Sequence, residues 1–214
     1  MMLIGINNRV GDLSMMKNVS SPSSNGGSLS AAVSSFQNGA SVSTVKAAIL
    51  DKLDGFAQAP AAQEQLQKLK NSLGGNLLHH VANFEKEATY IAPLVSLGVD
   101  INATNTAGVT PLFFAVVSKT AKPEMIESLL SQGADPNVQH AKTGNPLLVQ
   151  ALLTAAPVAN LEVLLTYPNV EIPTNFKLSS GREMSVMDLV ARSYSEPDRT
   201  TLTNLLTPKN DGVA

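Results

Sequence analysis

The stretch from Asn105 to Val138, NTAGVTPLFFAVVSKTAKPEMIESLLSQGADPNV, decides the fold. A helix is predicted to start at Thr110 and Pro111, because a threonine hydroxyl caps a helix and a proline at the first helical position loses no hydrogen bond. A second helix is predicted to end before Gly133, since glycine adopts the left-handed C-terminal conformation without a Cβ clash. This second helix carries one apolar stripe, predicted to lie in the core and formed by Met125, Ile126, Leu129 and Leu130.

The same landmarks recur upstream of this stretch. LLHHVA at 77–82 stands where PLFFAV stands at 111–116, and GVDINA at 98–103 matches GADPNV at 133–138. The second pair is offset by 35 positions. In a repeat array each unit buries its face against a copy of itself, so this recurrence indicates a repeat.

Two further copies are predicted downstream. GNPLL at 144–148 reopens the pattern, with Leu147 in the place of Leu112, and LEVLL at 161–165 supplies the core of a second helix. The end of this copy is altered, because NVEI at 169–172 replaces Gly-Ala-Asp-x-Asn. A fourth, terminal copy is predicted from residues 181–191, with a second helix that carries Leu202, Leu205 and Leu206.

TPLFFA at 110–115 and GADPN at 133–137 resemble the Thr-Pro-Leu-His-x-Ala start and the Gly-Ala-Asp-x-Asn end of the ankyrin repeat. The match departs from the family at Phe113, which replaces the usual histidine. The resemblance implies an all-α solenoid of three to four ankyrin repeats over residues 74–207.

Residues 43–73 lack these landmarks but carry two helical patterns, so they are predicted to form a helical cap over the first repeat. A terminal unit needs such a cover because no further copy packs on its apolar face. The inward residues of the first helix are predicted to be Val45, Ile49, Leu53 and Phe56. Those of the second helix, over 61–73, are predicted to be Leu66, Leu69 and Leu73. A flexible tail is expected at 208–214.

Residues 1–42 are expected to form a disordered leader. The stretch 18–43 is dominated by Ser, Asn, Gly and Ala and holds a single aromatic residue, Phe36, so it has too little apolar area to offset the entropy of ordering it. Its weakly charged composition resembles the N-termini of bacterial type III secretion effectors, among which ankyrin modules are common. This resemblance implies a secretion signal and a secretion chaperone as a partner of the leader; a plain tail or linker is the alternative.

The composition argues against several classes of protein. A formal net charge of −2, without a basic cluster and interleaved aromatics, is not that of a nucleic-acid binder. The 214 residues include no cysteine and three histidines, which leaves no disulfide framework and no zinc site built on thiolates. No apolar run is long enough to span a bilayer, so membrane insertion is not expected.

Catalysis is not expected either. The chain lacks a nucleophile elbow, a phosphate-binding loop, a dinucleotide-binding loop and a zinc-protease motif, so no catalytic residue, cofactor or metal site is predicted. His79 and His80 form the one pair that invites acid–base chemistry near neutral pH. The resemblance implies a structural hydrogen bond for His79, at the repeat histidine, and a groove-facing position for His80.

The resemblance also implies where a partner protein would bind, because the family uses the tips of its loops, called fingers, and the groove face of each first helix. Carried over by position, the candidates at the finger tips are Asn105, Thr106, His140 and Lys142. The candidates in the groove are His80, Phe114 and Val149. Phe114 is the most informative, since an exposed aromatic ring can anchor an interface. The alternative for this ring is packing against the neighbouring first helix.

One finger is predicted to be lengthened. Leu147 and Met187 are 40 positions apart, against 35 between Leu112 and Leu147, and part of the excess falls in residues 174–182. Repeat proteins often place insertions on the binding face. This segment therefore adds three candidate contacts, Phe176, Lys177 and Arg182. In the alternative, the alternating apolar residues of the segment tuck under the helices.

These patterns predict a non-catalytic protein–protein interaction module. The predicted setting is a bacterial effector, secreted into a host cell, that binds a host protein through its groove. One alternative is a cytoplasmic scaffold or inhibitor subunit acting in its own cell. Another is an enzyme of unrecognised type that uses polar residues of the groove.

Overall fold

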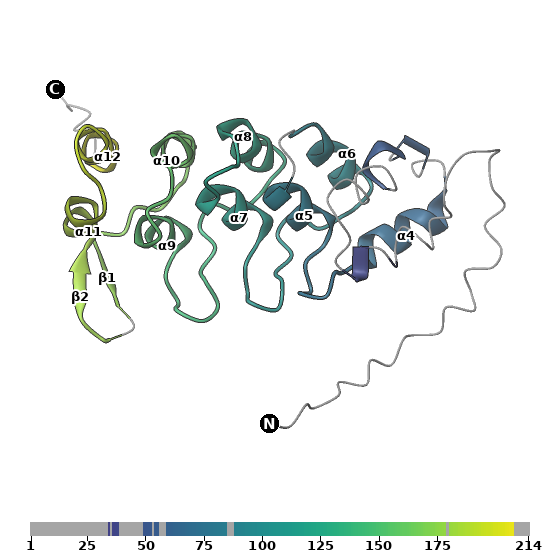
Figure 1. Cartoon of the computed structure of the whole chain (residues 1–214), viewed down its shortest axis with the longest axis horizontal. Coiled ribbons are helices and arrows are strands. Elements are labelled where there is room, and N and C mark those ends of the chain that lie inside the picture. Colours follow the sequence, from purple (N-terminus) through teal and green to yellow (C-terminus); the bar gives the residue numbers. More distant parts are fainter. Residues whose placement is uncertain are drawn as a thin grey trace.

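The computed structural model describes residues 34, 36–38, 49–52, 54–55, 59–84, 88–178 and 180–207. Over these residues the fold is mostly helical and consists of helical hairpins stacked side by side (Figure 1). The first helices of the hairpins form one row, the second helices form a second row above it, and the connecting fingers project to one side. The predicted solenoid of stacked helical repeats is confirmed.

From α5 onward the described α-helices pair in the order of the sequence, and each pair is one repeat. Repeat one holds α5 (Leu77–Phe84) and α6 (Ile91–Ser96), and repeat two holds α7 (Pro111–Val117) and α8 (Pro123–Ser131). Repeat three holds α9 (Leu147–Leu153) and α10 (Val158–Thr166), and repeat four holds α11 (Val186–Ser193) and α12 (Asp198–Leu206). The short 3-10 turns are η2 (Leu50–Lys52) and η3 (Ala88–Tyr90).

The helix ends follow from local chemistry. The Thr110 hydroxyl accepts a hydrogen bond from the backbone N–H of Phe113 at 3.3 Å, which satisfies a donor that the first turn of α7 leaves without a partner. Gly133 follows α8 with φ +94°, the left-handed conformation predicted for it. Asn169 occupies the corresponding place after α10 with φ +67°. The altered third repeat therefore keeps its left-handed residue, because asparagine tolerates this conformation better than other residues with a Cβ.

The apolar stripe of α8 lies in the core, as predicted. Its four residues are at most 1 % exposed, and they belong to a hydrophobic cluster that continues from the first described helical turns to α12. Helix α8 packs against α7 within its own repeat and against α6 and α10 on either side. Each hairpin thus buries its stripe by contact with the next one.

The side chains of two asparagines connect consecutive repeats, because each bonds to backbone groups of the next repeat. The side-chain amide of Asn102 donates to Gly133 O at 3.2 Å and its Oδ1 accepts from the Asp135 N–H at 2.9 Å. Asn137 makes the same pair of bonds one repeat later, with the backbone of Asn169 and Glu171. The asparagine of the Gly-Ala-Asp-x-Asn end therefore sets the distance between neighbouring hairpins.

A buried asparagine performs a similar task inside the helical rows. Asn160 on α10 is 1 % exposed, and its amide N–H groups lie 3.1–3.2 Å from backbone oxygens at the end of α7, those of Ala115, Val116 and Ser118. Carbonyls in the last turn of a helix have no partner within the helix. Asn160 supplies one from the neighbouring repeat.

The N-terminal cap agrees with prediction in part. Helix α4 (Pro60–Lys68) buries Ala62 and Leu66, and Leu69 directly after it is 3 % exposed. The predicted inward position of Leu73 is wrong, because this side chain is 64 % exposed. The helix ends at Lys68, and Leu73 instead lies in the first finger, where its carbonyl accepts hydrogen bonds from Thr106.

Other predictions for the termini fall mostly outside the described residues. This holds for the leader over 1–42, apart from 34 and 36–38, and for the tail over 208–214. It also holds for three predicted inward residues of the cap, Val45, Leu53 and Phe56. Ile49, the fourth, is fully buried as predicted. Phe36, inside the predicted leader, is 2 % exposed and belongs to the hydrophobic core.

The lengthened finger is a small hairpin of two antiparallel strands, β1 (Asn175–Lys177) and β2 (Glu183–Ser185). Phe176 pairs with Met184 across the hairpin. The prediction of an all-α chain therefore holds for the repeats, and this two-stranded sheet is added to them just before α11 (Figure 1).

Replacing Asn160 by alanine should lower the free energy of unfolding by about 1–3 kcal/mol, because buried carbonyls at the end of α7 lose their donor. Urea denaturation measures the change. The control is Asn204→Ala on the exposed side of α12, for which the change should stay within about 0.5 kcal/mol. Equal effects of the two substitutions would contradict this role of Asn160.

Candidate partner-binding surface

Three fingers precede α5, α7 and α9, and their tips pack against one another. Thr106 at the tip of the second finger donates from its backbone N–H and its hydroxyl to Leu73 O in the first finger, at 3.0 and 2.9 Å. Gly108 has φ +73°, and a Cβ built on it would lie 2.1 Å from the Cβ of Ala141 in the third finger. Only glycine allows this close approach, so the tips form one continuous surface.

The predicted tip residues lie on this surface, but two of them also hold it together. The side chain of Asn105 accepts from the backbone N–H groups of Ala107 and Val109 at 2.9 and 3.1 Å, which closes the turn of its own finger. Thr106 is exposed, but its hydroxyl donates a hydrogen bond to Leu73 O in the first finger. Substitution of either residue would therefore change the shape of the finger as well as its chemistry.

The third finger offers side chains that point outward. The ring of His140 lies 5.6 Å from the ring of Phe113, and its Nδ1 is 3.3 Å from the hydroxyl of Thr143. This ring thus covers the phenylalanine that replaces the repeat histidine. Lys142 is exposed at the tip.

The third finger also contains one residue more than the others, which shifts the register of α9. The N–H of Asn105 bonds to Val109 O four residues later, whereas the N–H of His140 bonds to Asn145 O five residues later. The position of Phe114 therefore falls on Gln150 in the third repeat and not on Val149. The predicted groove-facing position of Val149 is wrong: this side chain is fully buried, whereas Gln150 is half-buried. The longer finger was the only sequence signal for Gln150.

His79 has the structural role that the resemblance implied. It is 3 % exposed, and its Nε2 lies 2.8 Å from Val109 O at the base of the second finger. With the proton on Nε2, the ring donates to Val109 O while Nδ1 accepts from the backbone N–H of Asn76 at 3.1 Å. His79 therefore connects the start of α5 to the next repeat.

His80 follows on the same helix but does not line an open groove. It is 6 % exposed, and the ring of Phe36 lies edge-on to it at a centroid distance of 5.7 Å. Burial lowers the pKa of His80 from 6.5 to about 4, so the ring is neutral at pH 7. His80 occupies the predicted groove position of its repeat, but it is not an accessible contact in this structure, because the ring of Phe36 from far upstream packs on it.

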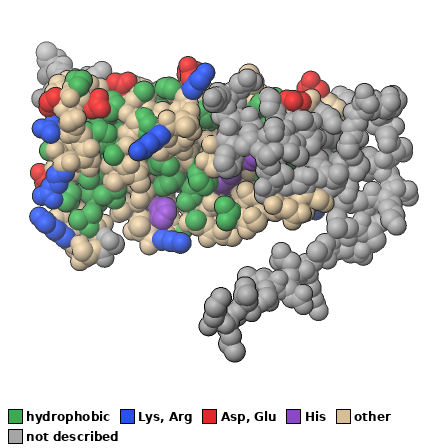
Figure 2. Space-filling model, in the orientation of Figure 1, with side chains coloured by type: hydrophobic (Ala, Val, Ile, Leu, Met, Phe, Trp, Pro, Cys, Tyr) green, Lys and Arg blue, Asp and Glu red, His purple; other side chains and the backbone are tan. Residues whose placement is uncertain are grey.

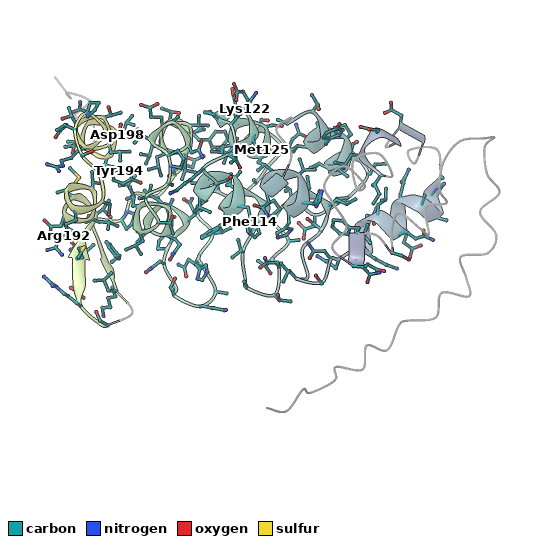
Figure 3. All side chains as sticks on the ribbon, viewed as in Figure 1. Phe114, Lys122, Met125, Arg192, Tyr194 and Asp198 are labelled. Carbon is teal, nitrogen blue, oxygen red and sulfur yellow. The ribbon has the colours of Figure 1, made fainter. Side chains whose placement is uncertain are left out.

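Phe114 occupies the equivalent position on α7 and remains half-buried. Its ring lies edge-on to that of His79 at 6.0 Å, so part of it packs against the neighbouring first helix. In Figure 3 Phe114 lies on the finger side of α7, whereas Lys122, just before α8, and Met125, on α8, lie in the other row. The alternative of packing against the neighbouring first helix is confirmed for part of the ring. The role of its exposed part as an interface anchor stays a prediction.

Of the three contacts predicted on the hairpin of β1 and β2, one is buried and two are exposed. Phe176 is 7 % exposed and packs into the core, so its predicted role as a surface contact is wrong and the alternative of tucking under the helices is confirmed. Side chains alternate along a strand, which places Lys177 on the solvent side. Lys177 lies 3.7 Å from Glu183, and Arg182 is exposed in the turn.

Charges differ between the two edges of the face shown in Figure 2. Basic side chains lie along its left end and lower edge, and acidic side chains are more frequent along the upper edge. The exposed cations of the third and fourth fingers are Lys142, Lys177 and Arg182, whereas Glu124, Glu127 and Glu162 are exposed on α8 and α10. The finger edge is the more basic of the two in this part of the solenoid.

Within the described residues, no group of three or more His, Cys, Asp or Glu side chains has the arrangement of a metal site. No helix among them is long and apolar enough to cross a membrane.

The buried histidines should make stability depend on pH. The pKa of both His79 and His80 is lowered by burial, and that of His80 is about 4. Between pH 4 and 6.5 the unfolded chain thus binds more protons than the folded chain, so the free energy of unfolding should fall as the pH drops through this window.

Urea denaturation between pH 5 and 7.5 measures this dependence above the main titration range of the carboxylates. The variant His80→Leu should show a smaller slope than the wild type. An identical slope in the two proteins would mean that His80 is not buried as described.

The comparison with known families agrees with this geometry. Residues 107–141 match the family model of the ankyrin repeat, a segment that contains α7, α8 and the tips on both sides. Ankyrin repeats are typically non-catalytic modules that bind other proteins. The hairpins on either side repeat the same bonds in the same order, so the matched ankyrin repeat lies within a stack of similar hairpins. An ankyrin repeat supports the function class of a protein–protein interaction module.

Proposed function

We propose that the protein binds its partner on one surface, called here the finger surface, made of Phe114, Gln150, His140, Lys142 and Arg182. The observation that carries the proposal is the half-buried ring of Phe114, which lies on the finger side of α7 (Figure 3), the side on which the packed finger tips project. Interfaces are commonly anchored by a few aromatic and arginine side chains within a polar rim. The finger surface has this composition.

The rigidity of the finger surface supports the same proposal. The tips are tied together by the Thr106 bonds to Leu73 and by the close approach of Gly108 to Ala141. A surface that is already ordered before binding loses less conformational entropy when a partner docks. The exposed cations of the third finger and of the β1–β2 hairpin, Lys142, Lys177 and Arg182, favour a partner with acidic residues opposite them.

We further propose that the protein is a bacterial effector, secreted into a host cell, and that its partner is a host protein. Support comes from the composition of residues 1–42, which resembles effector N-termini, together with the interaction module that follows. A cytoplasmic scaffold or inhibitor subunit with the same finger surface is the competing proposal. The two differ in whether the N-terminal segment directs export.

Replacing Phe114 by alanine should weaken partner binding at least tenfold, which corresponds to about 1.4 kcal/mol, because the anchor of the finger surface is lost. The measurement is quantitative capture from host-cell lysate with immobilised wild type and variant, followed by titration of the captured protein.

The matched control is Val163→Ala, which removes a half-buried apolar side chain on α10 in the other row. Lys122→Ala, at an exposed position before α8, tests the remote edge. Equal recovery of the partner by wild type and Phe114→Ala would place the interface elsewhere. Loss of the partner with Val163→Ala as well would point to a general loss of packing.

Residues 1–50 fused to a reporter enzyme should direct secretion from a bacterium with a working type III apparatus. The fusion should remain in the cell when the apparatus is inactivated. The chain without its first 50 residues, fused to the same reporter, is the control and should not be exported. Retention of the first fusion would reject the effector setting and favour the scaffold, while leaving the finger surface untested by this assay.

A further inference from the structure

Phe36 and His80 form a contact between the N-terminal part of the chain and the first repeat. Their rings lie edge-on at 5.7 Å, and the two residues are 2 % and 6 % exposed. Such an arrangement of aromatic rings is favourable beyond the apolar area that it buries. The contact is therefore a specific docking of one ring on another.

The place where Phe36 docks belongs to the repeated row that faces a partner. His80 on α5, Phe114 on α7 and Gln150 on α9 occupy the same position in three successive repeats. Phe114 and Gln150 are half-buried, whereas His80 is covered. The first repeat differs from the next two because a side chain of the same chain already lies on this position.

The described residues around Phe36 have the form of a short docked peptide. The N–H of Asn38 bonds to Ser34 O at 3.1 Å, which closes one helical turn. Within that turn Phe36 is buried, while Gln37 and Asn38 are exposed. Helical peptides fill grooves by burying apolar anchors on one face and leaving the other face exposed, and this turn has the same division.

We infer that the segment carrying Phe36 is an intramolecular ligand of the first repeat. While its ring covers His80, a partner can reach only the positions of Phe114 and Gln150 and the neighbouring fingers. Displacement of the ring opens a further position and lengthens the available surface by one repeat. This inference extends the proposed function and rests on it, because it takes the groove positions to be sites of partner binding. The contact between Phe36 and His80 can be tested without any partner.

The three histidines of the chain provide the test, because each lies in a different environment. Diethyl pyrocarbonate modifies neutral, accessible imidazoles, and peptide mass spectrometry resolves the rate at each site. At pH 7 in the full chain, the half-buried His140 should react faster than His79, which is buried and bonded to Val109 O. His80 should be at least about tenfold slower than His140 if Phe36 covers it in solution.

The variant Phe36→Ala should raise the rate at His80 about tenfold and leave His79 slow. The variant Phe36→Leu, which keeps an apolar anchor, should give a smaller increase. A fast reaction of His80 in the wild type, or an unchanged rate in Phe36→Ala, would overturn the inference. An equal increase at His79 and His80 would also overturn it, because Phe36 would then be a part of the core that cannot leave without opening the repeat.

A peptide added to the Phe36→Ala protein tests the ligand role directly. The probe is residues 30–42 of this chain, and the control is the same peptide with alanine in place of Phe36. Because a short tether provides an effective concentration on the order of 1 mM, the peptide is used up to about that concentration. Protection of His80 by the first peptide alone supports the inference, and equal effects of both peptides overturn it. Neither result depends on whether the finger surface binds a host protein.

Discussion

The structure depends on one constraint: no helical hairpin of this chain can bury its apolar stripe by itself. The stripe of α8 becomes inaccessible only because α6 and α10 lie on either side of it. The removal of apolar area from water stabilises the fold by about 25 cal/mol per Å². Most of this stabilisation therefore arises at the junctions between repeats. At the N-terminal end α4 and Phe36 contribute to the same core, whereas Met187 on the terminal repeat remains 39 % exposed.

Apolar burial alone would allow neighbouring hairpins to slide, and directional polar contacts fix their position. His79 reaches Val109 O, Asn102 reaches the backbone of the next repeat, and Asn160 covers the end of α7. His79 and Asn160 are buried and would be costly to bury without their partners, so they accept only one register of the stack. The same register brings Gly108 against Ala141 and aligns the finger tips, so the shape of the binding surface follows from the packing of the core.

Much of this arrangement is local and was predictable. Three features depend only on the chemistry of neighbouring residues and are present as expected. They are the start of α7 at Thr110 and Pro111, the left-handed conformation of Gly133 after α8, and the buried stripe of α8. Position-by-position transfer was less successful for the candidate site. Val149 was misplaced by one residue, because the third finger is longer by one and a helix turns by about 100° per residue. Phe176 was misplaced because strand alternation turns it inward beneath the helices.

The sequence by itself thus determined the fold class, the start of α7 and the end of α8, the structural role of His79 and the location of the fingers. These depend on backbone preferences and on a hydrophobic period that can be read within a few tens of residues. The tertiary structure alone decided which residues of the surface are available. Leu73 lies outward because α4 ends early, and His80 is covered because Phe36 folds back onto it. Accessibility depends on contacts between distant segments, and no local pattern encodes them.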